Sequence, residues 1–185
     1  KKWLFDDPEN KNYLVQLSQT GHYTAKFEVF EGDGGKRAAS QKLNDLAHSL
    51  PSGQELLFYS VNPKVLWHFN EKEIYIKWKD EILEILNQGN SLTIIHSLNQ
   101  QSHSLILILT EWLSAEFTSQ LTSYYYTDFS KPLLNPMVMI IRDKAAVISM
   151  TIEGISDRLY THYFTDPVTV QQNQLIFDTF LTECP

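Results

Sequence analysis

The sequence predicts a single α/β domain in which a mixed, mostly parallel sheet is flanked by helices on both faces. Strand-like segments alternate with segments of helical period, so each helix can cross over from one strand to the next. Segment 92–97, LTIIHS, is largely apolar on both faces, as a central parallel strand requires. The 185 residues are 43% hydrophobic and 12% aromatic, which is enough for one substantial core.

The first half of the chain is expected to form three strands and two helices. Residues 1–22 are polar and irregular and are assigned to a linker or docked segment, whereas the α/β domain extends over residues 23–185. Segment 23–30 alternates between apolar and polar residues. From Lys36 the apolar spacing becomes helical. In chain order the elements are strand 23–30, helix 36–50, strand 56–61, a helix with apolar positions over 75–86 that ends at Gly89, and strand 92–97.

The second half is expected to add one helix, one hairpin, two further strands and a final helix. Arg142-Asp143-Lys144 is a link of hairpin length between two apolar segments. Asp166-Pro167 is a helix start, because the carboxylate can cap the helix and proline suits its first position. The expected elements are helix 103–117, strand 121–126, strands 137–141 and 145–150, strand 158–164 and helix 166–181.

Composition and charge disfavour two classes of partner. The net charge of −7 opposes a phosphate backbone, so this domain is expected to make no contact with nucleic acid. The apolar runs are far shorter than the ~20 residues that a membrane span needs. The single cysteine, Cys184, excludes an internal disulfide and fits a reducing, cytoplasmic environment.

The order of elements resembles a single phospholipase-D-like domain. A glycine-rich turn leads into a helix over 29–39, a helix runs into a Gly-x-x-φ-x-φ-φ strand (φ, apolar) over 81–95, and a hairpin follows over 137–150. Active members of that superfamily carry His-x-Lys-x4-Asp on this hairpin. The matching positions here are Asn135, Met137 and Arg142, and none of the six histidines is followed two residues later by lysine. The resemblance therefore implies the fold without phosphodiesterase chemistry.

A second resemblance concerns function. The segments EILNQGNSLTIIHSLN and YYYTDF are similar to the region that follows a helix-turn-helix in some Gram-positive bacterial regulators. This implies a non-catalytic effector-sensing or oligomerisation domain of a bacterial transcriptional regulator. The chain starts Lys-Lys-Trp without methionine, so a DNA-binding module is expected N-terminal to Lys1. A small-molecule effector is the expected partner, and a homodimer is left open. An enzyme with a reassigned pocket and a pure protein-interaction module are the alternatives.

The candidate ligand site lies at the carboxyl ends of the predicted strands. Ligands of open α/β sheets bind at such ends, and aromatic walls with a few polar tips suit small metabolites. The alternative is that these side chains are simply packed and capped by backbone groups. The candidate residues are Tyr59, Ser60, His96, Ser97, Tyr124, Tyr125, Tyr126 and Asn135.

A second candidate site precedes the first helix. Gly34, Gly35, Lys36 and Arg37 combine exposed amides with two cations and could hold an anion. The spacing is not that of a P-loop, and the alternative is a tight turn with a solvated basic edge. No metal or cofactor is expected, since no two histidines have HxH or HxxxH spacing. Trp67, Trp78 and Trp112 are assigned to the core.

Overall fold

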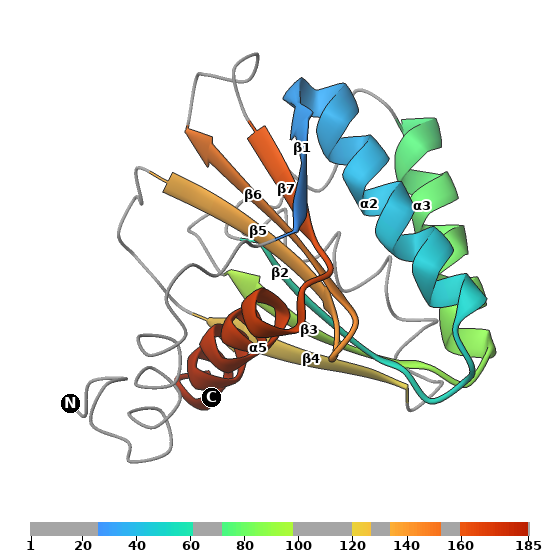
Figure 1. The fold of residues 1–185 in the computed structure, drawn as a ribbon. Helices are drawn as coiled ribbons and strands as arrows, with labels where there is room; N and C mark the ends of the chain where they lie inside the picture. Colours follow the sequence, from blue (N-terminus) through green and yellow to red (C-terminus); the bar gives the residue numbers. More distant parts are fainter. Residues whose placement is uncertain (1–25, 61–71, 98–119, 127–133, 153–159, 185) are drawn as a thin grey trace.

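A computed structural model describes residues 26–60, 72–97, 120–126, 134–152 and 160–184, which form one mixed sheet with helices on both faces (Figure 1). Residues 1–22, the predicted helix 103–117, Trp67 and Trp112 lie outside the described residues. In chain order the elements are β1 (Phe27–Glu31), α2 (Gly32–Ser49), β2 (Glu55–Ser60), α3 (Lys72–Asn87), β3 (Ser91–Ser97), β4 (Leu121–Tyr126), β5 (Leu134–Ile141), β6 (Ala145–Ile152), β7 (Tyr160–Phe164) and α5 (Pro167–Thr182).

The sheet is mostly antiparallel, so the prediction of a mostly parallel sheet was wrong. The seven strands have the order β1-β7-β6-β5-β2-β3-β4. Only β2–β3 and β3–β4 are parallel, whereas the other four neighbouring pairs are antiparallel. The hairpin accounts for the β5–β6 pair, because strands joined by a short turn must run in opposite directions, whereas parallel neighbours need a longer crossover such as α3.

Helices cover both faces of the sheet, as predicted. On one face α2 and α3 pack with Leu43 and Ile82 in a core that includes Phe58 of β2 and Met139 of β5. On the other face α5 packs in a second core through Val170 and Phe177, together with Leu57 and Ile140. Alternate residues of the central strands β2 and β5 are therefore buried on opposite faces. Each fully buried Leu or Ile stabilises the fold by about 1.5–3 kcal/mol.

Most of the local signals lie where the sequence placed them. The carboxylate of Asp166 accepts a hydrogen bond of 2.8 Å from the amide of Thr169, and proline follows as the first helical residue of α5. Gly89 ends α3 with a φ of +87°. In the hairpin turn Asp143 has a φ of +60°, and the amide of Lys144 donates to the carbonyl of Ile141 over 3.0 Å.

One helix boundary differs from the prediction. Helix α2 begins at Gly32, not at Lys36, and Gly32 has a φ of +68°. The left-handed conformation, which glycine adopts without steric cost, turns the chain directly from β1 into the helix. The glycine-rich segment is therefore the first turn of α2.

Arg142 joins three elements at the turn end of the hairpin. Its Nε donates to Glu55 Oε2 over 2.8 Å, and its two terminal nitrogens donate to the Asp178 carboxylate, each over 2.9 Å. Glu55 opens β2 and Asp178 lies on α5. The guanidinium thus holds the hairpin, β2 and α5 together with the planar geometry that carboxylates favour.

We expect Arg142→Met to lower the free energy of unfolding by about 1–2 kcal/mol, because two neighbouring carboxylates lose their shared cation. Denaturant unfolding measures the change. The matched control is Lys144→Met, an exposed cation in the same turn, which should alter the free energy of unfolding only slightly. Equal effects of the two substitutions would contradict the bridging role of Arg142.

Candidate functional site

The sheet divides the predicted strand-end cluster between its two faces. Because side chains alternate along a strand, Ser60, His96 and Tyr125 lie on the face covered by α2 and α3. Tyr59, Tyr124 and Tyr126 lie on the α5 face, where they pack against the second core. Ser97 and Asn135 belong to β3 and β5, but their side chains lie outside the described residues.

The tyrosines on the α5 face pack against one aromatic residue of the helix. The ring of Phe180 lies 4.7 Å from that of Tyr59 in an edge-on arrangement, and 4.5 Å from that of Tyr126. All three aromatic residues are only partly exposed. Their common contact is a packing contact between α5 and the sheet.

On the other face a row of polar side chains crosses the sheet. The register pairs Thr161 with Ser149, Ser149 with Met137, Met137 with Ser60, and Ser60 with His96. All five residues lie at one level of the sheet, and four are polar. We call Thr161, Ser149, Ser60 and His96 the polar row. Their exposed fractions are between 1% and 6%.

The polar row contains a hydrogen-bonded end and an aromatic end. Thr161 Oγ1 donates to Ser149 Oγ over 3.1 Å. The His96 ring stacks on Tyr125 of β4 with ring centroids 5.5 Å apart. Burial lowers the pKa of His96 to about 4, because removal from water disfavours the charged imidazolium. At neutral pH the row therefore offers hydroxyl groups and one neutral imidazole.

Lys36 brings a buried cation to the same side of the sheet. Lys36, Ala39 and Leu43 share one helix face, and the last two belong to the core between α2 and the sheet. Lys36 is 7% exposed, and burial lowers its pKa to about 8 while Asp33 partly opposes the shift. The ammonium group thus remains mostly charged at pH 7.

A close approach between α2 and β1 positions Lys36. A Cβ atom on Gly35 would lie 2.9 Å from the carbonyl carbon of Phe30, so glycine allows the helix to contact the strand. Phe30 is in turn the register partner of Thr161. The first turns of α2, which contain Lys36, therefore start next to the β7 end of the polar row.

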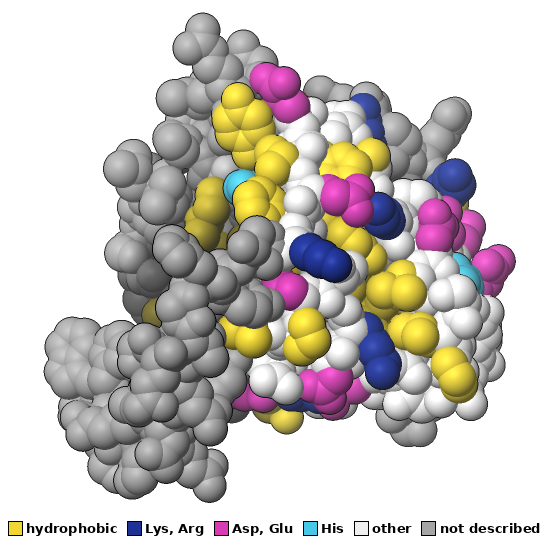
Figure 2. Space-filling model, viewed as in Figure 1, with side chains coloured by type: hydrophobic (Ala, Val, Ile, Leu, Met, Phe, Trp, Pro, Cys, Tyr) yellow, Lys and Arg dark blue, Asp and Glu magenta, His cyan; other side chains and the backbone are white. Residues whose placement is uncertain are grey.

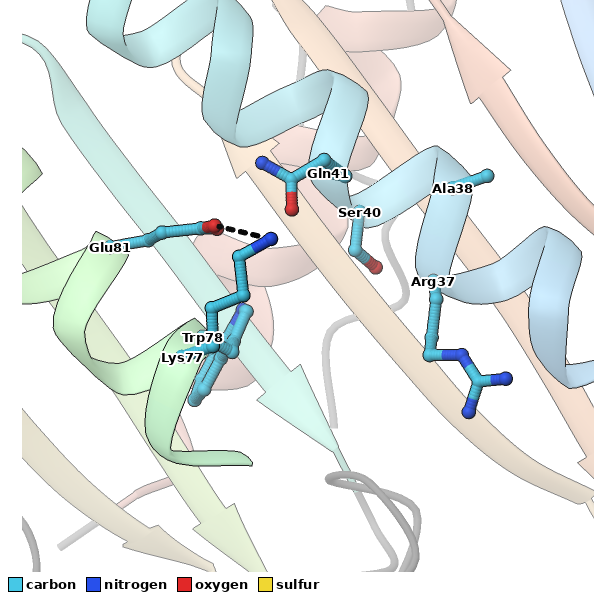
Figure 3. Close-up of a pocket in the computed structure, with 7 residues that line it drawn as sticks. All are labelled: Arg37, Ala38, Ser40, Gln41, Lys77, Trp78 and Glu81. Carbon is cyan, nitrogen blue, oxygen red and sulfur yellow. Dashed lines mark ion pairs between the residues drawn. The ribbon is translucent and has the colours of Figure 1, made fainter. Parts of the chain in front are cut away.

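The four residues of the predicted anion site do not share one environment. Gly34 is exposed, Gly35 packs on Phe30, and Lys36 faces the sheet. Arg37 lines a groove of about 260 Å³ between α2 and α3 (Figure 3). The other residues of this groove are Ala38, Ser40, Gln41, Lys77, Trp78 and Glu81. Anion binding by this set stays a prediction.

The groove has a polar wall and an aromatic wall. Glu81 accepts a hydrogen bond from Asn44 over 3.2 Å and forms an ion pair of 3.8 Å with Lys77. Trp78 is 6% exposed, and its ring lies 6.0 Å from that of Phe58. Trp78 thus belongs to the core, as predicted. Because most of its indole is buried, the groove offers little aromatic surface for stacking.

Sequence reasoning missed Thr161 and Ser149 as candidate site residues. Each is a small polar residue on an alternating strand, a common pattern on solvated faces. Only the register, which places both at the same level of the sheet as Ser60, distinguishes them. Strands β6 and β7 pair with each other and lie far from β2 in the sequence. The spacing of residues along the chain therefore does not show that Ser149 and Thr161 share one level of the sheet with Ser60.

The described residues hold no group of three His, Cys, Asp or Glu side chains arranged for a metal ion. Within the same part of the chain, no helix has the length and apolar character to cross a membrane.

The architecture is thus that of an α/β domain with a seven-stranded mixed sheet and helices on both faces. No family model matches the chain, and no curated protein matches its sequence. Solved structures do match. One is TrmBL2, an archaeal chromatin protein whose structure shows a novel mode of DNA binding. The TM-score is 0.59 and the identity 12%, and the match covers 96% of this chain and 60% of that one. At this identity the likeness shows the fold alone.

Acid should destabilise the domain through His96. In the unfolded chain the pKa returns to about 6.5, so between pH 6.5 and about 4 the unfolded chain binds more protons than the folded one. The free energy of unfolding is therefore highest above pH 6.5. It falls by at most about 3 kcal/mol as the pH falls towards 4. Denaturant unfolding as a function of pH measures it.

His96→Leu should flatten this pH dependence, whereas His48→Gln on α2 should retain it. The same pH dependence in wild type and His96→Leu would contradict a buried neutral imidazole.

Two adjacent glycines test the contact between α2 and β1. Gly35→Ala should destabilise the domain by about 1–3 kcal/mol, because the added methyl group meets the backbone of Phe30. Gly34→Ala meets nothing within 4 Å and should be neutral or stabilising, since alanine favours the helix. Thermal unfolding compares the two variants. A Gly35→Ala variant as stable as Gly34→Ala would contradict the close approach.

Proposed function

We propose that this chain is a non-catalytic sensing domain of a DNA-binding regulator, and that it binds a small polar effector at the polar row. The observation that carries the proposal is the row itself, four polar side chains buried at one level of the sheet. Burying polar groups in a protein core costs free energy unless they gain partners. Thr161 and Ser149 already bond each other, and hydroxyl groups keep further capacity to donate and accept that a polar ligand would use.

The chemistry of these residues favours an effector with an anionic group. Lys36 is the buried cation on this side of the sheet, in the turns of α2 that begin next to Thr161. The hydroxyl groups of Ser149, Ser60 and Thr161 can donate and accept, and neutral imidazole can do both through its two nitrogens. A carboxylate or phosphate carried by a hydroxylated metabolite would match this set.

The absence of catalysis is proposed from the motif positions. Met137 stands in the place of the phosphate-binding lysine. It is buried and apolar, and it lies at the level of the polar row, opposite Ser60. Arg142, in the place of the aspartate, joins β2 and α5. The nucleophile's own position is Asn135, whose amide cannot perform the nucleophilic step.

The regulator context is proposed from fold likeness and charge. TrmBL2 is a DNA-binding chromatin protein, and the match covers 60% of its chain. Here the net charge of −7 disfavours DNA contact by the domain itself. We therefore assign DNA binding to a separate part of the full protein. The relationship to Gram-positive regulators stays a prediction.

Thermal shift with a panel of acidic and neutral metabolites tests the site. We expect at least one hydroxylated carboxylate or phosphate to raise the melting temperature of the wild type. Lys36→Met and Thr161→Val should each abolish the shift, measured against the variant's own melting temperature. Thr93→Val, which changes a threonine on the opposite face of β3, is the matched control and should retain it.

Two results would contradict the proposal. A thermal shift that survives Lys36→Met would show that the ligand binds elsewhere. A panel in which no acidic compound raises the melting temperature would leave the proposed site without support. Conversion of the bound compound to a product would show an enzyme instead.

A further inference from the structure

Met137 interrupts the polar row and divides it into two polar pairs. It lies on β5 between Ser149 and Ser60, and it is 1% exposed. One pair is Thr161 and Ser149 on β7 and β6, and the other is Ser60 and His96 on β2 and β3. The side chain of Met137 belongs to the apolar core between the sheet and helices α2 and α3. A ligand that contacts both pairs must therefore cross an apolar thioether.

The strand order fixes the distance between the two pairs. Ser149 lies on β6 and Ser60 on β2, with β5 between them. Neighbouring strands are about 4.7–4.9 Å apart, so these two positions are separated by roughly 9–10 Å. One small anion cannot contact both pairs at once, whereas an extended molecule with a polar group at each end can.

The pair on β7 and β6 suits an anionic group. Thr161 Oγ1 donates to Ser149 Oγ over 3.1 Å, so the Ser149 hydroxyl can direct its own hydrogen to a ligand. Lys36 is buried on this side, in the turns of α2 that start beside Phe30, the register partner of Thr161. Figure 2 shows Lys and Arg side chains interspersed with Asp and Glu around α2, so the surface charge there is mixed. The buried Lys36 is thus the cation that favours an anion at this pair.

The pair on β2 and β3 suits a hydroxyl group. His96 is neutral at neutral pH, because burial lowers its pKa to about 4. A neutral imidazole has one donor and one acceptor nitrogen, and the hydroxyl group of Ser60 can also donate and accept. Stacking on Tyr125 orients the imidazole ring. A ligand hydroxyl group, which both donates and accepts, matches this pair.

We propose that the effector is an ω-hydroxy acid, with a carboxylate or phosphate at one end, a hydroxyl group at the other end and an apolar middle that lies on Met137. The proposal rests on the proposed function and adds the length, the orientation and the apolar middle of the ligand. The anionic end binds Lys36 and Ser149, and the hydroxyl end binds Ser60 and His96. Contact with the thioether removes apolar ligand surface from water, which favours binding. A hydroxylated middle would lose its water there without gaining partners.

A homologous series of ω-hydroxycarboxylates tests the length of the ligand. The probes are the ω-hydroxy derivatives of propanoate, hexanoate, octanoate and dodecanoate, measured by titration calorimetry with the full chain. The octanoate derivative is close in extended length to the span between the pairs, so it should bind at least about tenfold more tightly than the propanoate derivative. The dodecanoate derivative should bind more weakly again. Affinity that is independent of length, or that still rises from octanoate to dodecanoate, would overturn the proposal.

A comparison of two acids tests the orientation. Octanoate lacks the hydroxyl group, so Ser60→Ala should weaken ω-hydroxyoctanoate by about tenfold and leave the affinity for octanoate almost unchanged. Lys36→Met should weaken the binding of both acids. Thr93→Val, on the opposite face of β3, is the matched control and should change neither. Equal losses for the two acids in Ser60→Ala would overturn the orientation.

Gluconate tests the apolar middle independently of the binding site, because its hydroxyl groups extend along its whole length. Binding of gluconate that depends on Lys36, without binding of ω-hydroxyoctanoate, would support the effector site and overturn the apolar middle. If no acid binds in a manner that depends on Lys36, both proposals fall.

Two substitutions of Met137 test the contact itself. Met137→Leu should bind ω-hydroxyoctanoate as the wild type does, whereas Met137→Gln should bind it about tenfold more weakly, because the amide faces the apolar middle of the ligand. Thermal unfolding checks that each variant is folded. Equal affinity of the two folded variants would overturn the contact. If Met137→Gln does not fold, the length series and the gluconate comparison on the wild type decide the question.

Discussion

The burial of β2 and β5 on both faces is the constraint on which the rest of the structure depends. Leu57 and Ile140 face α5, whereas Phe58 and Met139 face α2 and α3. A one-residue slip of either strand would exchange its two sets of side chains between cores of different shape. The register of the central pair is therefore fixed by packing. It then fixes the level at which every outer strand presents its polar residues.

This constraint determines what the two faces can do. On the α5 face the tyrosines at the strand ends serve packing, because Phe180 lies against Tyr59 and Tyr126. On the opposite face the same strand ends carry Ser60 and His96, and the register continues the row through Met137 to Ser149 and Thr161.

The sequence predicted the features that depend on neighbouring residues. The Asp166 cap, the Gly89 helix end and the turn at Asp143 are local, and all three were confirmed. The sheet type was predicted wrongly because alternation identifies a strand but not its neighbours. The inward direction of Lys36 was also missed, since Lys36 follows three glycines that resemble a loop and instead form the first turn of α2. For the candidate site, Ser60 and His96 were predicted from strand ends, whereas Ser149 and Thr161 required the register.

The polar row is proposed to be a binding site. A crystal structure of the chain with an acidic hydroxylated metabolite that raises its melting temperature tests it most directly. We predict that the compound lies between the first turns of α2 and strands β7, β6 and β2, with its anionic group bonded to Lys36 Nζ and its hydroxyl groups to the polar row. A compound bound in the groove between α2 and α3, with the polar row unchanged, would contradict it.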